Sequence, residues 1–125
     1  MDIAHRSGLA NSSLRKRLLE YALAKPEAYA DHPWGEDVAK VAKKVFVFFG
    51  VQDSNDPGMT VKLPSSQPLA LAQDGVVSSA YGLGKAGWVT VRFSAGLPYE
   101  MLREWIDESY RTVAPKKLQG VKSIE

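Results

Sequence analysis

The residues of this sequence whose types and spacing suggest a binding function are positively charged side chains on predicted strands and at two tight connections. They are Lys40, Lys43, Lys44, Lys62, Lys85 and Arg92, together with Trp88 beside the second connection. Lysine and arginine contact the phosphates of nucleic acids, and a tryptophan ring can stack on a base. These seven residues predict a nucleic-acid interface, with DNA as the partner. Lysines at strand ends also protect sheet edges and keep proteins soluble, so charge by itself leaves both interpretations open.

No group of residues in the sequence has the spacing of a catalytic or metal site. The absence of cysteine removes disulfides, thiol catalysis and thiolate metal sites. His5 and His32 stand far apart, and Ser109 lacks the GxSxG turn of a serine nucleophile. Glu104 and Glu108 share a predicted polar helix face, where carboxylates are normally solvated. We therefore expect a protein that is not an enzyme, with no catalytic residues and no metal.

Two short motifs resemble cofactor sites but lack the context that such sites need. Residues 82–87 (GLGKAG) match the dinucleotide fingerprint, which binds pyrophosphate at the N-terminus of a following helix. Here the segment WVTVRF follows, which predicts a strand and makes the glycines a hairpin connection. Residues 53–58 (DSNDPG) begin like a calcium loop, but Pro64 stands where the bidentate glutamate belongs, which indicates a turn. We expect no cofactor.

The length and composition predict one globular domain. The chain has 125 residues, of which 45% are apolar and 24% are charged, close to globular averages. Sixteen Lys and Arg against fourteen Asp and Glu give a net charge of +2, which is too small to name a partner. No apolar run approaches the ~20 residues of a membrane span, and the first residues lack the apolar core of a signal peptide. We expect a monomer in the reducing cytoplasm that does not bind membranes.

Helical periodicity predicts one helix near each end of the domain. The first begins at Ser12 or Ser13, buries an apolar face that includes Leu18, and ends before Pro26. The second begins at Pro98 and carries one apolar stripe, formed by Leu102, Trp105, Ile106, Ser109 and Val113. Residues 1–11 show no period and are expected to form a loose lead-in. Pro115 ends the second helix, two lysines follow it, and residues 119–125 are expected to form a tail.

The middle of the chain has the pattern of strands. The expected strands are Val38–Val41, Lys44–Gly50, Met59–Leu63 and Trp88–Phe93, with a short helix at Gln67–Gln73. The first two strands must be joined tightly, and the last two alternate between apolar and polar residues. The order is therefore α-β-β-β-α-β-α. Clustered strands between terminal helices predict a single α+β domain over residues 12–118, with an antiparallel sheet flanked by helices.

This arrangement resembles the MmcQ/YjbR family of small bacterial proteins. The residues that carry the resemblance are Leu18–Leu23, Pro26-Glu27-Ala28, Pro33-Trp34-Gly35, Lys44-Val45-Phe46, Val61-Lys62-Leu63, Gly87-Trp88-Val89, Leu102, Trp105-Ile106 and Asp107-Glu108-Ser109-Tyr110. The resemblance runs from about Ser12 to Leu118. It implies an antiparallel sheet with flanking helices, similar to type III secretion chaperones, and a double-wing motif proposed for DNA binding.

The resemblance assigns the two wings to particular segments. They are the hairpin at Val41–Lys44 and the segment Gly82–Gly87. Ala42 and Lys43 stand where the family often has glycine, and a two-residue primed turn needs positive φ, which disfavours such a turn here. The chaperone-like architecture also supports an alternative function, a protein-interaction adaptor that uses apolar rather than basic surface.

Overall fold

The computed structural model describes residues 2–79 and 86–118, with side chains from Ala10 onward. The strands are β1 (Tyr29–Asp31), β2 (Glu36–Val41), β3 (Lys44–Val51), β4 (Gly58–Lys62), β5 (Val76–Ser78) and β6 (Trp88–Arg92), and the helices are α1 (Asp2–Leu23), α2 (Gln67–Leu71) and α3 (Tyr99–Val113). All strand pairs are antiparallel, in the order β1-β2-β3-β4-β6-β5. This is the α+β fold that the sequence predicts. Within the described residues, no helix combines the length and the apolar character that a membrane span needs.

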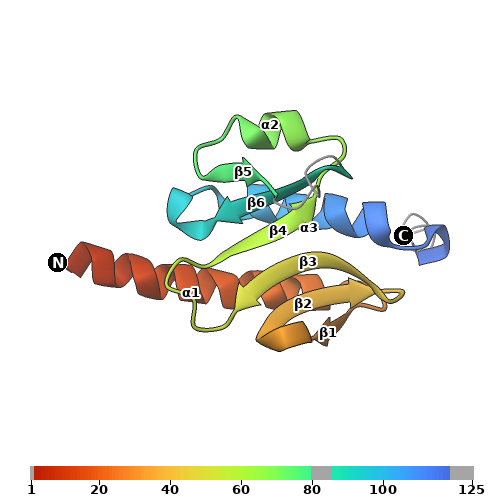
Figure 1. Cartoon of the computed structure of the whole chain (residues 1–125), viewed down its shortest axis with the longest axis horizontal. Coiled ribbons are helices and arrows are strands. Elements are labelled where there is room, and N and C mark those ends of the chain that lie inside the picture. The colour runs from red at the N-terminus through yellow and green to blue at the C-terminus, as the bar shows by residue number, and fades with distance from the viewer. Residues whose placement is uncertain (1, 80–85, 119–125) are drawn as a thin grey trace.

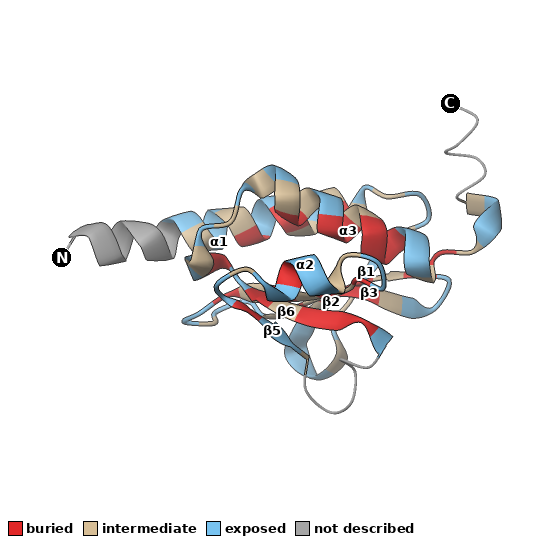
Figure 2. Ribbon diagram, turned by 90° about the horizontal axis from the view of Figure 1, so that it is seen from above, coloured by how far each residue is buried: buried red, intermediate tan, exposed pale blue. Residues whose placement is uncertain are grey.

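Helices α1 and α3 cover the same face of the sheet, and the core lies between them and the strands (Figures 1 and 2). Leu18 of α1 and Leu102 and Ile106 of α3 are fully buried there, as the apolar stripes predicted. Helix α2 lies beside β5 and β6. The opposite face of the sheet, called the outer face below, carries Phe48 and the polar side chains of β4 and β6.

Helix α1 is longer than the sequence pattern indicated. It begins at Asp2, so the expected loose lead-in over residues 1–11 is wrong from Asp2 onward, and Ser12 and Ser13 lie inside the helix rather than at its start. Apolar periodicity reports burial, and a helix that is already nucleated extends by one hydrogen bond per residue without needing a buried face. The absence of a period therefore did not predict the absence of a helix.

The bulged register of β3 accounts for the almost continuous apolar run KVFVFF in its sequence. Its register against β2 shifts twice, because Asp37 pairs with Gly50 and Val38 with Phe48, and then Ala39 pairs with Val47 and Lys40 with Val45. The strand therefore has extra residues at Phe49 and Phe46, and both side chains join the core. A bulge re-aims side chains in this way, so three of four consecutive residues can face one side.

Two short edge strands complete the sheet and differ from the sequence expectation. Residues Tyr29–Asp31 form β1, which pairs with β2. Residues Val76–Ser78 form β5, which pairs with β6. Strands of three residues have too few side chains to show a period, and pairing with a neighbour decides their structure.

Residues 107–110 of α3, the DESY segment, join the elements of the fold. The Ser109 hydroxyl donates to Phe46 O of β3 at 2.5 Å and accepts from Lys62 N of β4 at 2.9 Å. Tyr110 donates from its hydroxyl to Pro26 O at 2.7 Å, and its ring meets Phe46 edge-on. These contacts tie α3 to the two central strands and to the end of α1, so the segment has a structural role.

Two charged residues are buried, Arg15 and Glu108, and for Glu108 the sequence predicted a solvated position. Glu108 accepts hydrogen bonds from the backbone N–H groups of Ser65 and Ser66 and from the Ser66 hydroxyl, at 2.6–3.1 Å. Arg15 of α1 donates to the carbonyls of Phe49 and Gly50, at 3.2 and 2.8 Å. Buried charges require such partners, and sequence periodicity does not reveal them.

Candidate nucleic-acid interface

The β2–β3 hairpin presents two of the predicted lysines at its tip. Val41 pairs with Lys44, so only Ala42 and Lys43 form the turn. Their φ angles are 52° and 70°, which are the positive values that a two-residue primed turn requires. The turn that the missing glycine disfavoured is therefore present, and the register of the flanking strands holds it. Lys43 and Lys44 are exposed at this end of the sheet.

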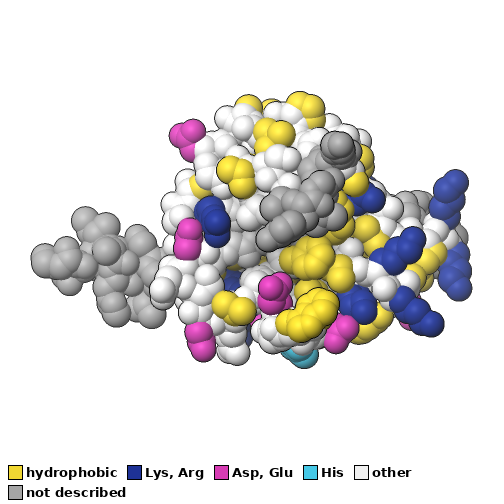
Figure 3. Space-filling view, viewed as in Figure 1, with side chains coloured by type: hydrophobic (Ala, Val, Ile, Leu, Met, Phe, Trp, Pro, Cys, Tyr) yellow, Lys and Arg dark blue, Asp and Glu magenta, His cyan; other side chains and the backbone are white. Residues whose placement is uncertain are grey.

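The C-terminal end of α3 brings two further lysines to the same end of the molecule. Lys116 and Lys117 follow α3 and are exposed. Lys117 and Lys43 line one hollow of about 630 Å³, whose other lining residues are Glu27, Tyr29, Ala42, Pro115 and Leu118. Figure 3 shows basic side chains gathered at this end. We call Lys43, Lys44, Lys116 and Lys117 the hairpin-end cluster.

Within the described part of the chain, no ion pair neutralises the positive charges of the hairpin-end cluster. Among the described residues, none of its four lysines forms an ion pair within 4 Å. Glu27 is the acidic residue among those that line the hollow. Glu27, Ala42 and Lys43 are three of the four non-glycine residues with positive φ in the described chain. Such conformations are unfavourable for residues with a side chain, so the surrounding structure must hold these three residues in place.

The other predicted basic residues are separated from the cluster or already paired. Lys40 Nζ lies 3.2 Å from Asp31 Oδ2 on the neighbouring edge strand. The backbone N–H of His32 and then the Lys40 ammonium hold the pKa of Asp31 below its usual value, so this acid stays charged. Arg92 Nε lies 3.6 Å from Asp56 Oδ2 and belongs to the opposite end of the sheet, where Arg92 pairs with Gly58.

Lys62 and Trp88 face each other across β4 and β6, but they differ in accessibility. Lys62 is half-buried on the outer face, at the end of β4 nearer the hairpin. Trp88 is only 8% exposed and meets Phe48 edge-on, with ring centroids 5.4 Å apart. A ring that is packed in this way offers no face to a base, so Trp88 is not available as the stacking residue that the sequence predicted. Lys85, with most of the second wing, lies outside the described residues.

The exposed end of β2 opposite the hairpin carries a chain of polar contacts. Asp37 accepts a 2.9 Å hydrogen bond from Arg15 and lies 2.8 Å from His32 Nδ1. Burial favours the neutral form of Asp37, but the hydrogen bonds and charges of Arg15 and His32 outweigh it and lower the pKa of this carboxyl. Asp37 therefore places a negative charge at this end of β2, opposite the hairpin. No group of three or more potential metal ligands occurs within residues 10–79 and 86–118.

The sequence assigned only Lys43 and Lys44 of the hairpin-end cluster to the interface. Lys116 and Lys117 were visible as a basic pair after Pro115, but nothing local in the sequence connects them with Lys43. Their connection depends on how α3 crosses the sheet, which is a tertiary feature.

Comparisons with known proteins agree with this architecture. The family model for YjbR matches residues 23–112 of the chain. A search of curated proteins finds no match. The fold is similar to a crystal structure of a Pseudomonas syringae protein, with 19% identity, coverage of 79% of this chain and 97% of that chain, and a TM-score of 0.63. It is also similar to a Deinococcus radiodurans protein with a DUF419 domain, with 22% identity, coverage of 76% and 74%, and a TM-score of 0.65.

The family match covers well over half of the chain, and it includes β1 to β6 and most of α3. Because the sequences of the two solved structures are less than 25% identical to this chain, they support the fold alone. Together with the DESY segment that ties α3 to β3 and β4, the match shows that this chain belongs to the YjbR family.

Proposed function

We propose that this protein is a non-enzymatic DNA-binding protein that contacts duplex phosphates through the hairpin-end cluster. The observation that carries the proposal is the convergence of four exposed lysines without ion-pair partners among the described residues. They come from two segments that are distant in sequence, Lys43-Lys44 and Lys116-Lys117. Ammonium groups placed in this way neutralise phosphates and release the counterions of DNA.

The proposed contacts favour weak binding with little sequence preference. Lysine contacts phosphate as a point charge, and the one aromatic residue of the predicted interface, Trp88, is buried. Phosphate contacts position a protein on DNA but carry no sequence information directly. We therefore expect a Kd of roughly 10⁻⁴–10⁻⁶ M at physiological salt, the range of non-specific binding.

The first experiment is a fluorescence-anisotropy titration of duplex DNA at several salt concentrations. Each neutralised phosphate contributes a log–log slope of about −0.9, so Lys43→Ala with Lys44→Ala should flatten the slope by about 1.8 if each lysine meets one phosphate. Lys116→Ala with Lys117→Ala should have the same effect. The matched control is Lys16→Ala with Arg17→Ala, which removes the same charge from an exposed part of α1 and should leave the slope near the wild-type value.

Two outcomes would contradict the proposal. The first is no measurable binding of the wild-type protein at low salt. The second is an equal change of slope in the hairpin variants and in the α1 control, because this would show a general effect of net charge. Either result would favour the adaptor function, for which Trp34 is the residue to substitute first. Its side chain is 96% exposed, and tryptophan is enriched at the centres of protein interfaces.

A further inference from the structure

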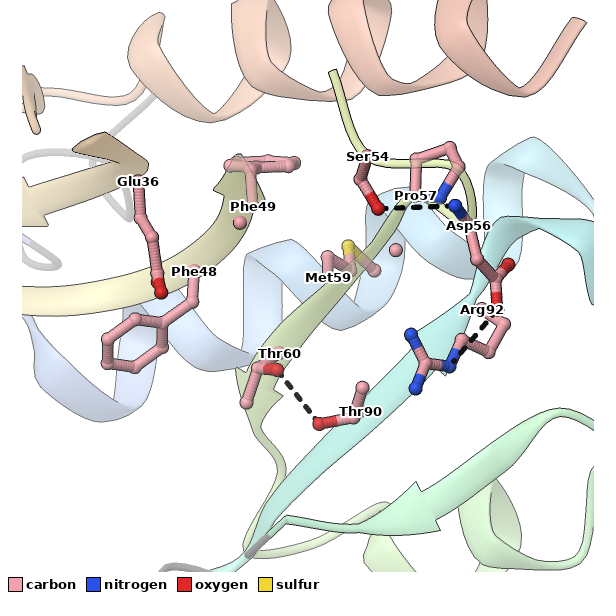
Figure 4. Close-up of a pocket in the computed structure, with 12 residues that line it drawn as sticks. Glu36, Phe48, Phe49, Ser54, Asp56, Pro57, Met59, Thr60, Thr90 and Arg92 are labelled. Atoms are coloured by element: carbon pink, nitrogen blue, oxygen red, sulfur yellow. Dashed lines mark hydrogen bonds and ion pairs between the residues drawn. The ribbon is translucent and has the colours of Figure 1, made fainter. Parts of the chain in front are cut away.

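The outer face has a concave feature of its own, at the place where β3 and β4 separate. These strands pair only at Val47–Val61 and Phe48–Thr60, whereas β4 stays paired with β6 as far as Gly58 and Arg92. The separation leaves a pocket of about 200 Å³ between β3 and the β4–β6 pair (Figure 4). The side chains of Phe49 and Met59, both almost fully buried, limit its depth.

Opposite charges stand on opposite sides of this pocket. Arg92 comes from β6, and Figure 4 shows the terminal nitrogens of its guanidinium turned toward Thr60 and Thr90. Its ion pair with Asp56 uses Nε, and no other acid among the described residues lies within 4 Å of it. Glu36 comes from β2 and stands beside Phe48 on the other side of the pocket, exposed and without an ion-pair partner in the described chain (Figure 4).

A pair of hydroxyl groups lies between the two charged walls. Thr60 Oγ1 and Thr90 Oγ1 are 2.9 Å apart, so one hydroxyl donates to the other. The accepting hydroxyl keeps its own hydrogen, which remains available to an oxygen atom of a ligand. The two terminal nitrogens of Arg92 can hold a carboxylate with two parallel hydrogen bonds, the strongest geometry of this kind.

We propose that this pocket binds a free α-amino acid. The carboxylate would lie between Arg92 and the Thr60–Thr90 pair, and the ammonium group would face Glu36. The volume equals that of about seven waters at ~30 Å³ each, which suits a ligand of amino-acid size. The pocket lies at the end of the sheet where Arg92 pairs with Gly58, opposite the hairpin, which separates it from the DNA contacts proposed above.

The test is isothermal titration calorimetry with each free amino acid, followed by two derivatives of any amino acid that binds. N-acetylation removes the ammonium charge, and amidation removes the carboxylate. We expect each derivative to bind about tenfold more weakly or worse, because each loses one charged hydrogen-bonding arm. In Glu36→Gln, the free amino acid should bind no more tightly than its N-acetyl derivative. In Arg92→Gln, it should bind no more tightly than its amide.

A control variant shows whether these effects belong to the pocket. Glu104→Gln removes an exposed carboxylate from α3 and should leave every affinity unchanged. Both pocket residues are exposed or half-exposed, so their variants should keep the wild-type circular dichroism and denaturation midpoint. No binding of any free amino acid at millimolar concentration would overturn the proposal, as would binding that neither pocket variant changes. The titrations contain no DNA, so their result is independent of the proposed function.

Discussion

The Tyr21 hydroxyl lies at the contact between α1 and α3. It donates a 2.6 Å hydrogen bond to Asp107 Oδ1, and Lys25 pairs with the same carboxylate. Burial, followed by the hydrogen bond to Asp107, raises the pKa of Tyr21 to about 12. The native state therefore holds this proton more tightly than the unfolded chain does, in which the ordinary value is about 10.

Replacement of Tyr21 by Phe should change the stability of the protein in alkali. A raised pKa contributes stability that is fully present below pH 10 and is lost as the pH rises toward 12. At neutral pH the free energy of unfolding of Tyr21→Phe should be about 1 kcal/mol lower than that of the wild type, because the hydrogen bond is lost. Above pH 10 the variant should lose less stability than the wild type does. Urea denaturation from pH 7 to pH 12 measures both effects. Tyr29→Phe is the control, because Tyr29 is 42% exposed and its hydroxyl forms no hydrogen bond in the described chain.

At the same scale, the candidate interface shows which residue properties a sequence reveals. Lys43 and Lys44 could be assigned because a tight connection between two strands must place its residues at the surface. Trp88 could not, because the alternation of β6 does not tell whether its second face is solvated or packed against Phe48. The partners of Lys40 and Arg92 come from other elements, so their partial neutralisation by Asp31 and Asp56 was also invisible.

Among the elements, the β2–β3 hairpin forms at a cost in backbone strain. Ala42 has a φ of 52°, a region in which a Cβ atom costs roughly 1–2 kcal/mol. Ala42→Gly should therefore stabilise the protein by about 1 kcal/mol, less what the added freedom of the unfolded chain removes. A higher urea midpoint with an unchanged m-value is the expected result. The matched control is Ala72→Gly, since Ala72 has a φ of −76° and gains nothing from glycine.

The outcome that would contradict a strained hairpin is an equal shift in both glycine variants. Ala42→Gly also keeps both hairpin lysines, so its DNA affinity tests whether strain itself matters for binding. The hairpin illustrates a more general point about elements. Two strands that pair over many residues can hold the turn between them in a conformation that the turn residues themselves disfavour.

For the whole molecule, stability depends on the two long helices sharing one face of the sheet. Leu102 of α3 is fully buried, so Leu102→Ala should lower the free energy of unfolding by roughly 2–5 kcal/mol. Leu69→Ala is the control, because Leu69 is 62% exposed on α2 and surface substitutions usually change stability by less than about 0.5 kcal/mol. Urea denaturation of both variants checks the prediction. An unchanged midpoint in Leu102→Ala would contradict the packing of α3 against the sheet.

The sequence by itself determined the elements whose pattern is long and regular. The alternation in Met59–Leu63 and Trp88–Phe93 predicted β4 and β6, and the stripe that begins with Leu102 predicted α3 and its buried face. These patterns are reliable because each element must turn one side to the core, and the period of its backbone fixes which residues lie there. The antiparallel α+β class followed from the order of those elements.

The tertiary structure alone decided the features that depend on a partner distant in sequence. The bulges at Phe46 and Phe49 and the edge strand β1 exist because of pairing with β2. The burial of Arg15 depends on carbonyls of β3, and the hairpin-end cluster depends on where the chain emerges after α3. A local pattern records which side of an element is buried, but not what lies against it, and it is the opposing group that determines whether a charge is paired, buried or free to bind.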